Sequence, residues 1–162
     1  MTTAINRRNL FAALAGSIIL AGGIASIGTA QAQSRTGGTV NQMTAGMALK
    51  GYDTVAYFTD KKAVKGSDKI THEWGGAKWH FASVANRDAF IKEPARYAPQ
   101  FGGFCAWGIA NGKLFDIDPV NAWKVVDGKL YVIFNADVKG LWEKDQANFI
   151  RKGDDNWPKL NS

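Results

Sequence analysis

The sequence predicts an α+β fold, a small single domain of β-hairpins packed against a few helices. Two glycine-containing pairs, Gly75-Gly76 and Asp127-Gly128, each separate two runs rich in aromatic and β-branched residues. That arrangement is typical of hairpins with two-residue turns. After each hairpin comes a polar residue suited to cap a helix, followed by apolar residues at helical spacing. No internal repeat and no second domain is apparent from the sequence.

Length and composition are those of one globular domain. The 162 residues, 46% hydrophobic and 21% charged, can bury a core, and they exclude disordered, collagen-like and coiled-coil proteins. The net charge of +6 comes from 20 basic and 14 acidic residues, with no Lys/Arg run longer than two. Because this charge is diffuse, we expect no nucleic-acid partner.

Residues 1–32 have the anatomy of a secretory signal peptide. Arg7 and Arg8, with no acidic residue near them, precede an apolar stretch at 10–27, and Ala30-Gln31-Ala32 offers a small-x-small cleavage site. Glycines dilute the stretch below the ~20 strongly apolar residues that a membrane span needs. We therefore expect export to the periplasm, cleavage near Ala32 and no membrane span afterwards.

The segment Asn6-Arg7-Arg8-Asn9-Leu10-Phe11 also resembles the twin-arginine export signal, whose substrates cross the membrane folded. Export of the unfolded chain by the general pathway is the alternative. Residues 33–48, rich in Ser, Thr, Gly and Gln, are then expected to be a flexible N-terminal segment. The folded domain is expected at 49–160.

Local patterns predict the first elements of that domain. Residues 53–58 have strand character, and residues 70–74 and 77–81 form the first hairpin. Ser83 can cap a helix over 84–92, with Phe90 and Ile91 on its inner face. Pro94 interrupts this helix before one further turn at 95–97.

The second half of the domain shows no clear recurrence of the motifs or spacings of the first half, and its elements are predicted separately. Small residues among aromatics at 102–108 require close backbone packing. Residues 122–126 and 129–134 flank the second hairpin turn. The last helix starts at Asn135 or Asp137 and runs to about Lys152, where Gly153 ends it.

The register of the first hairpin separates the two histidines. A two-residue turn pairs His72 with Trp79 and Thr71 with His80, and neighbouring residues face opposite sides. His72 then lies on the apolar face, as a structural histidine or a ligand. His80 lies on the polar face, as a solvated side chain or a ligand. They cannot bind one ion from this hairpin, but either could act beside Cys105.

Cys105 is the only cysteine, which excludes an internal disulfide framework and zinc sites built from paired cysteines. Its thiol is either a small buried hydrophobic group or a functional one, because a lone exposed thiol is a liability in an oxidising compartment. A thiolate with one imidazole favours a copper or zinc ion. The candidate metal ligands are therefore Cys105, His80 and His72.

Acidic residues suggest turns more than catalysis. Asp116 and Asp118 lie on one side of an extended segment before Pro119, where they could bind a hard cation or form a turn or helix cap. Asp53 is expected to be a local acceptor for backbone N–H groups. No phosphate loop, Gly-x-Ser-x-Gly elbow or His-Glu-x-x-His motif indicates a hydrolase, and no catalytic residue can be assigned.

An ordered set of motifs spans most of the chain after residue 49. They are Lys50-Gly-Tyr-Asp-Thr-Val-Ala-Tyr-Phe58, Trp79-His80-Phe81-Ala82-Ser83, Asn86-Arg87-Asp88-Ala89-Phe90, Pro94-Ala-Arg-Tyr97-Ala-Pro99, Gln100-Phe-Gly-Gly-Phe-Cys-Ala106, Asp116-Ile-Asp-Pro119 and Val126-Asp-Gly-Lys-Leu-Tyr131. On these motifs the chain resembles the YHS-domain family, named for a Tyr-His-Ser motif.

The resemblance implies a link to metals. Related short domains bear cysteines in the stretch matching residues 81–90 and are regarded as metal-binding, whereas Ala82 and Ala85 stand at those places here. In some relatives the position matching Cys105 is reported as selenocysteine, which implies a reactive chalcogen.

Three functions are compatible with these observations. The leading hypothesis is binding of a soft transition metal, copper favoured, through Cys105 and either His80 or His72, with ligands completed across a dimer as one possibility. The second is thiol redox chemistry of Cys105 with an external thiol partner. The third is a non-catalytic module whose aromatic surface docks another envelope protein. The oligomeric state is left open.

Overall fold

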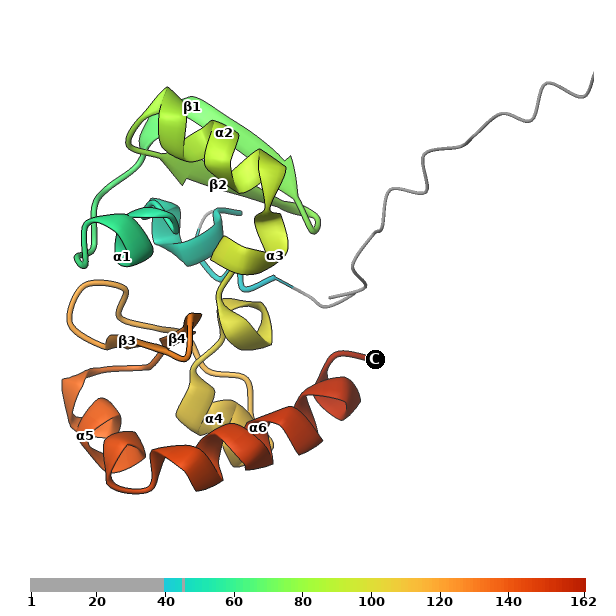
Figure 1. Ribbon diagram of the computed structural model, residues 1–162. Helices are drawn as coiled ribbons and strands as arrows, with labels where there is room; N and C mark the ends of the chain where they lie inside the picture. The colour runs from blue at the N-terminus through green and yellow to red at the C-terminus, as the bar shows by residue number, and fades with distance from the viewer. Residues whose placement is uncertain (1–39, 45) are drawn as a thin grey trace, which may run out of the picture. The chain divides into compact units, whose positions relative to one another are not determined.

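The computed structural model describes residues 40–44 and 46–162, and it has the predicted α+β architecture (Figure 1). The predicted signal peptide and twin-arginine motif lie outside the described residues. Short 3-10 helical turns are labelled η, α-helices α and strands β. In chain order, the elements are η1 (Ala48–Gly51), α1 (Ala56–Thr59), β1 (Ser67–Trp74), β2 (Ala77–Phe81), α2 (Val84–Lys92), α3 (Pro94–Tyr97), η2 (Gln100–Gly103), α4 (Ala106–Ala110), β3 (Trp123–Val126), β4 (Lys129–Val132), α5 (Ala136–Lys144) and α6 (Gln146–Leu160). None of the helices in this part of the chain has the length and apolar character needed to cross a membrane.

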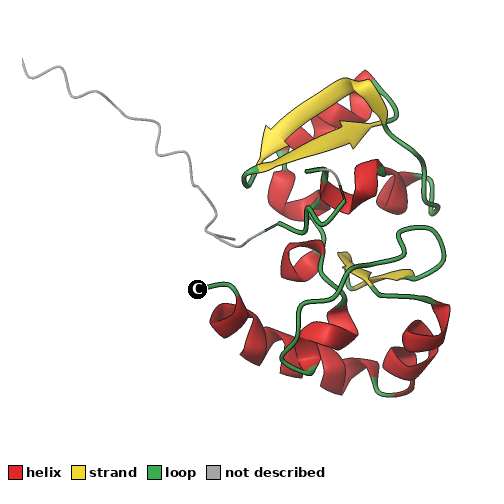
Figure 2. Ribbon diagram, turned by 180° about the vertical axis from the view of Figure 1, so that it is seen from behind, coloured by secondary structure: helices red, strands yellow, loops and turns green. Residues whose placement is uncertain are grey.

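The first hairpin has the predicted register. His72 pairs with Trp79 and Thr71 with His80 in the antiparallel pair β1–β2, and a bulge follows Ser67. Helix α2 lies along one face of this hairpin, as Figures 1 and 2 show from opposite sides. Its Phe90 ring lies 4.9 Å from the Trp79 ring, centroid to centroid. Burial of these aromatic rings fixes the helix on the hairpin.

Helix α2 begins as predicted, because the Ser83 hydroxyl accepts a hydrogen bond from the Asn86 N–H at 3.1 Å. Phe90 is fully buried, as expected. The inner position predicted for Ile91 is wrong, since its side chain is 47% exposed. One residue further along a helix turns the side chain by about 100°, which takes Ile91 off the face that Phe90 occupies.

The strand predicted at 53–58 is wrong, because the chain turns there and forms α1 instead. The Asp53 carboxylate accepts the Val55 N–H at 2.9 Å, and such a side-chain acceptor offers the backbone an alternative to strand pairing. Tyr57 on α1 is buried, and its hydroxyl donates to the Pro119 carbonyl at 2.8 Å. The ring of Tyr57 also meets Trp123 edge-on at 4.9 Å between centroids. The β-rich composition of this segment therefore serves burial on a short helix.

The second hairpin, β3–β4, is also confirmed, with its turn at Asp127-Gly128. Asn135 caps the following helix, α5, by accepting the Val138 N–H at 2.8 Å. The single last helix predicted from there is wrong. At Asp145 the backbone leaves helical geometry (φ −144°, ψ 49°), and a separate helix, α6, follows it.

Helix α6 does not end at Gly153, as predicted, but passes through it to Leu160. A Cβ atom at Gly153 would lie 2.5 Å from Cζ of Phe101. The glycine is therefore required for the close approach of α6 to the Phe101 ring, and it is not a helix stop.

We expect Gly153→Ala to lower the free energy of unfolding by about 1–3 kcal/mol, because the new methyl group overlaps the Phe101 ring. The matched control is Gly140→Ala in α5, where nothing lies within 4 Å of the new Cβ. That change should raise stability by about 0.5–1 kcal/mol through helix propensity. Urea unfolding of both variants measures the two effects, and equal effects would contradict the packing explanation.

Candidate functional site

Cys105 lies in the core, immediately before α4. Its side chain is 0% exposed. Its N–H donates to the Phe115 carbonyl at 3.1 Å, and its own carbonyl accepts from the Ile109 N–H at 2.9 Å. The thiol is therefore fixed between the start of α4 and the segment that follows this helix.

Two opposing effects act on the pKa of the Cys105 thiol. Burial raises it, while the backbone N–H groups of Gly108, Phe134 and Trp107 beside the sulfur act to lower it. The net pKa is raised, so the thiol is protonated at neutral pH. Cys105 makes no cap hydrogen bond of standard geometry, which fits the weakness of sulfur as an acceptor.

Three residues whose backbone groups lie beside Cys105 carry aromatic side chains: Trp107, Phe115 and Phe134. A hollow of about 230 Å³ is lined by Trp107, Phe115, Phe134 and Val138. The rings of Phe115 and Phe134 lie 6.3 Å apart, and the two side chains are 37% and 48% exposed. The surface beside Cys105 is therefore apolar and partly open.

His80 is buried, at 9% exposure, so the solvated position predicted for it is wrong. Its face of the hairpin is covered, because a Cβ at Gly51 would lie 3.6 Å from the imidazole Nδ1 and one at Gly66 would collide with the His80 backbone at 2.5 Å. Burial lowers the pKa of His80; Asp68 opposes this, and Lys78 and Lys65 add to it.

His72 is half-buried on the opposite face, as predicted, with its ring 6.3 Å from that of Phe90. The structure does not bring the three candidate ligands together. Figures 1 and 2 show α4 beside α6, away from the hairpin β1–β2 that carries both imidazoles. Among the described residues, no group of three or more His, Cys, Asp or Glu side chains could hold a metal ion.

The predicted acidic pair is engaged in structural contacts. The Asp118 carboxylate accepts the backbone N–H groups of Val120 and Asn121 at 2.9 and 3.1 Å, so it forms the predicted turn. Burial acts to raise the pKa of Asp118, but these hydrogen bonds hold it below its usual range.

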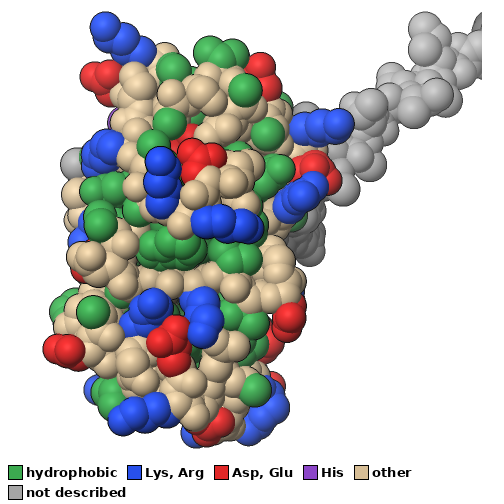
Figure 3. Space-filling model, turned by 60° about the vertical axis from the view of Figure 1, so that its left-hand side comes forward, with side chains coloured by type: hydrophobic (Ala, Val, Ile, Leu, Met, Phe, Trp, Pro, Cys, Tyr) green, Lys and Arg blue, Asp and Glu red, His purple; other side chains and the backbone are tan. Residues whose placement is uncertain are grey.

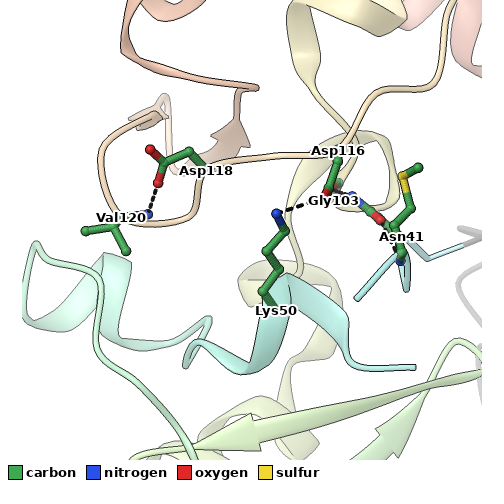
Figure 4. A network of polar contacts seen from close by, with 7 residues as sticks. Asn41, Lys50, Gly103, Asp116, Asp118 and Val120 are labelled. Atoms are coloured by element: carbon green, nitrogen blue, oxygen red, sulfur yellow. Dashed lines mark hydrogen bonds and ion pairs between the residues drawn. The ribbon is translucent and has the colours of Figure 1, made fainter. Parts of the chain in front are cut away.

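Asp116 belongs to a network that joins three segments (Figure 4). Its carboxylate lies 2.7 Å from the Lys50 ammonium, and the Asn41 amide donates to it at 3.5 Å and to the Gly103 carbonyl at 3.0 Å. Burial acts to raise the pKa of Asp116, but Lys50 and the other donors hold it below its usual range. Asn41 was not predicted, because it lies in a polar segment whose composition carries no local signal of burial.

Asp53 is the local acceptor that the sequence predicts, and it also accepts hydrogen bonds from residues that are distant in the sequence. Its carboxylate is buried and accepts the Ala82 N–H at 2.8 Å and the Asn86 side-chain amide at 2.7 Å. It therefore holds the start of α2, at the place where metal-binding relatives are expected to carry thiols. The link to Asn86 was missed, because it depends on the folded position of α2.

We expect stability to fall as the pH drops from 7 to 5, because His80 is held in its neutral form. Its folded pKa lies below that of the unfolded chain, about 6.5, so the unfolded state takes up the proton first. Urea unfolding at several pH values measures this loss. His80→Gln should show a smaller loss over the same range, and an identical pH dependence would contradict the assignment.

Figure 3 shows how the charged side chains of the described residues are distributed on one face of the molecule. On the face in Figure 3 the Lys and Arg side chains are scattered, with Asp and Glu between them. This distribution agrees with the diffuse charge predicted from the sequence.

Comparison with known proteins yields one match. The family model of the YHS domain matches residues 55–101, and this family is associated with metal binding. No curated protein and no solved structure matches the chain. His72 and His80 lie inside the matched segment, and Cys105 lies just beyond it. The match therefore identifies residues 55–101 as a YHS domain.

Proposed function

We propose that this protein binds a soft transition-metal ion, copper in preference to zinc, through the sulfur of Cys105. The YHS family is associated with metal binding, and Cys105 is the only thiol in the chain. Thiolate sulfur is a soft ligand that suits Cu(I) and zinc, and copper stands above zinc in the general order of affinity of divalent metals. The observation that carries the proposal is that this single thiol lies directly after the YHS match at residues 55–101. The backbone N–H groups of Gly108, Phe134 and Trp107 oppose the rise in pKa that burial causes, which reduces the cost of a buried thiolate.

The described residues do not supply a complete set of metal ligands. Tight sites usually take three or four, and no such group exists in the described part of the chain. We therefore propose weak binding, with further ligands from a small molecule or from a second copy, whose half-buried His72 is a better candidate than its buried His80. We also propose that the protein acts in the periplasm after cleavage near Ala32, which N-terminal sequencing of the mature protein tests.

Metal analysis tests the main proposal. Protein recovered from the periplasm without chelators should carry copper detectable by mass spectrometry, or take up Cu(I) on titration, and Cys105→Ser should lower the affinity at least tenfold. Serine is the appropriate substitution, because it keeps a small polar atom at the start of α4. Equal metal content and affinity in the two proteins would overturn the proposal.

Thiol redox chemistry has less support from the geometry. Reactive cysteines are accessible and have a lowered pKa, whereas Cys105 is buried and its pKa is raised. A slow alkylation rate of the native thiol, compared with the unfolded chain, would agree with this.

A second candidate function is a docking module, favoured by the exposed apolar surface around the hollow next to Cys105. Phe115 and Phe134 line the hollow. Leu114 precedes Phe115 in the chain, Leu141 lies about one helical turn after the lining residue Val138, and all four side chains are 37–48% exposed. Apolar patches of this kind mark interaction sites. We propose that a second copy of the chain binds to this surface, because the proposed metal site is incomplete without further ligands.

Self-association tests this candidate. Sedimentation equilibrium should show a dimer that Phe134→Ser weakens at least tenfold. The matched control is Ile91→Ser on α2, a similarly exposed apolar residue (47%) away from this surface, which should leave association unchanged. A monomer at all concentrations, or equal effects of both changes, would reject the second copy as occupant.

A further inference from the structure

Two stretches of the chain have the same elements in the same order, and most element boundaries in the second stretch lie 52 residues after those in the first. Helix α2 spans Val84–Lys92 and α5 spans Ala136–Lys144, so both ends differ by 52 (136 less 84, and 144 less 92). The turns η1 and η2 begin at Ala48 and Gln100, again 52 apart. We infer that residues 48–97 and 100–149 are two copies of one structural unit, called here the first and second units.

The opening turns of the two units share a rare backbone conformation. Leu49 and Lys50 have φ of 49° and 53°, and their counterparts Phe101 and Gly102 have φ of 56° and 60°. Left-handed geometry is uncommon for residues other than glycine, so its appearance at the same offset is informative. In each unit the same hydrogen bond closes the turn at 3.0 Å, from Tyr52 N–H to Leu49 in the first and at the equivalent positions in the second.

The hairpins and cores correspond as well. The turn pairs Gly75-Gly76 and Asp127-Gly128 all have positive φ and are 52 apart. In the first unit, the rings of Trp79 and Phe90 are tilted by 33° with centroids 4.9 Å apart. Their counterparts Tyr131 and Trp142 are tilted by 38° at 5.6 Å. Both helices are capped by the residue that precedes them, Ser83 and Asn135.

The expectation that the chain contains no internal repeat is therefore wrong. The repeat is difficult to detect by comparing the sequences of the two units, because equivalent core positions carry different large side chains, such as Trp79 in the first unit and Tyr131 in the second. Packing requires volume and an apolar surface at these positions and tolerates such changes of identity.

The correspondence assigns a structural role to Cys105, since it occupies the position of Asp53. Both are fully buried. The Asp53 carboxylate accepts the N–H groups of Val55 and Ala82. The sulfur of Cys105 lies beside the N–H groups at the equivalent positions, Trp107 and Phe134. The N–H groups beside the Cys105 sulfur, one in α4 and one just before α5, are thus the counterparts of the two N–H groups that Asp53 accepts in the first unit.

One further position explains why the two groups differ in charge. In the first unit, Asn86 donates its side-chain amide to Asp53 at 2.7 Å. Its counterpart is Val138, whose side chain has no donor. A buried carboxylate needs donors to offset its desolvation, whereas a neutral thiol does not. The pairs Asp53–Asn86 and Cys105–Val138 are therefore two solutions to one structural requirement. This assignment does not rest on the proposed metal site.

A double-mutant cycle in the full chain tests the correspondence. Cys105→Asp should destabilise the fold, because the new carboxylate lacks the donor that Asn86 supplies in the first unit. Adding Val138→Asn should recover at least a tenfold larger folding equilibrium constant relative to Cys105→Asp alone, measured by urea unfolding. Val138→Asn by itself should not stabilise the protein. Additive effects of the two changes would overturn the inference.

A second measurement keeps the inference testable if Cys105→Asp does not fold. Hydrogen exchange at the amides of Trp107 and Phe134 should be at least tenfold faster in Cys105→Ala than in Cys105→Ser, because only serine retains an acceptor beside them. If Cys105 is merely a small buried hydrophobic group, alanine is the better replacement. Equal or faster exchange in Cys105→Ser would therefore overturn the structural role.

Discussion

The buried carboxylate of Asp53 is the constraint on which the first half of the fold depends. It is 0% exposed and accepts hydrogen bonds from Val55, Ala82 and Asn86. A carboxylate in such a place is costly unless its donors are present, so the turn before α1 and the start of α2 must form together. Because α2 carries Phe90 onto the hairpin, this hydrogen bonding fixes the aromatic core between helix and hairpin.

The second unit meets the same requirement with a neutral thiol, and that difference bears on function. A sulfur with only backbone N–H groups beside it is held less firmly than the carboxylate, and the side chains of Trp107 and Phe134, whose N–H groups lie beside the sulfur, line an apolar hollow. The second unit is therefore the half in which a ligand could reach the buried sulfur, by displacing the side chains that line the hollow. Any metal chemistry at Cys105 is added to a structural role, which is why serine and alanine replacements carry different information.

Local signals made the hairpins and caps predictable from the sequence. The turn pairs and the capping residues Ser83 and Asn135 depend on backbone geometry within a few residues, and all of them were confirmed. The errors arose where a distant contact decides the structure. The segment after Asp53 becomes a helix because the Asp53 carboxylate is hydrogen-bonded in the folded core. Position 153 requires a glycine, within a helix that continues past it, because the ring of Phe101, far away in sequence, leaves no room for a Cβ atom.

The candidate site was harder to predict for the same reason. Residue types alone suggested that Cys105 and a histidine could share a metal ion, but their meeting depends on how the two units fold, and each imidazole belongs to the first hairpin. Burial of His80 likewise comes from Gly51 and Gly66, whose lack of a side chain allows close approach. Sequence patterns identify the chemically capable residues, whereas only the fold decides which of them are neighbours.

The segment before the first unit completes the second one. In the first unit, Lys65 and Gly66 bond the opening-turn carbonyls, the side chain of Lys65 donating to Lys50 and the N–H of Gly66 to Gly51. In the second unit the equivalent carbonyls, Gly102 and Gly103, accept from the N–H and the side-chain amide of Asn41. Asn41, which lies outside the second unit, thus supplies the two donors that the first unit supplies from its own residues.

Cleavage near Ala32, as proposed, leaves Asn41 attached, whereas loss of the chain through residue 41 would leave two turn carbonyls without donors. The second unit therefore depends on a segment that its own repeat does not contain.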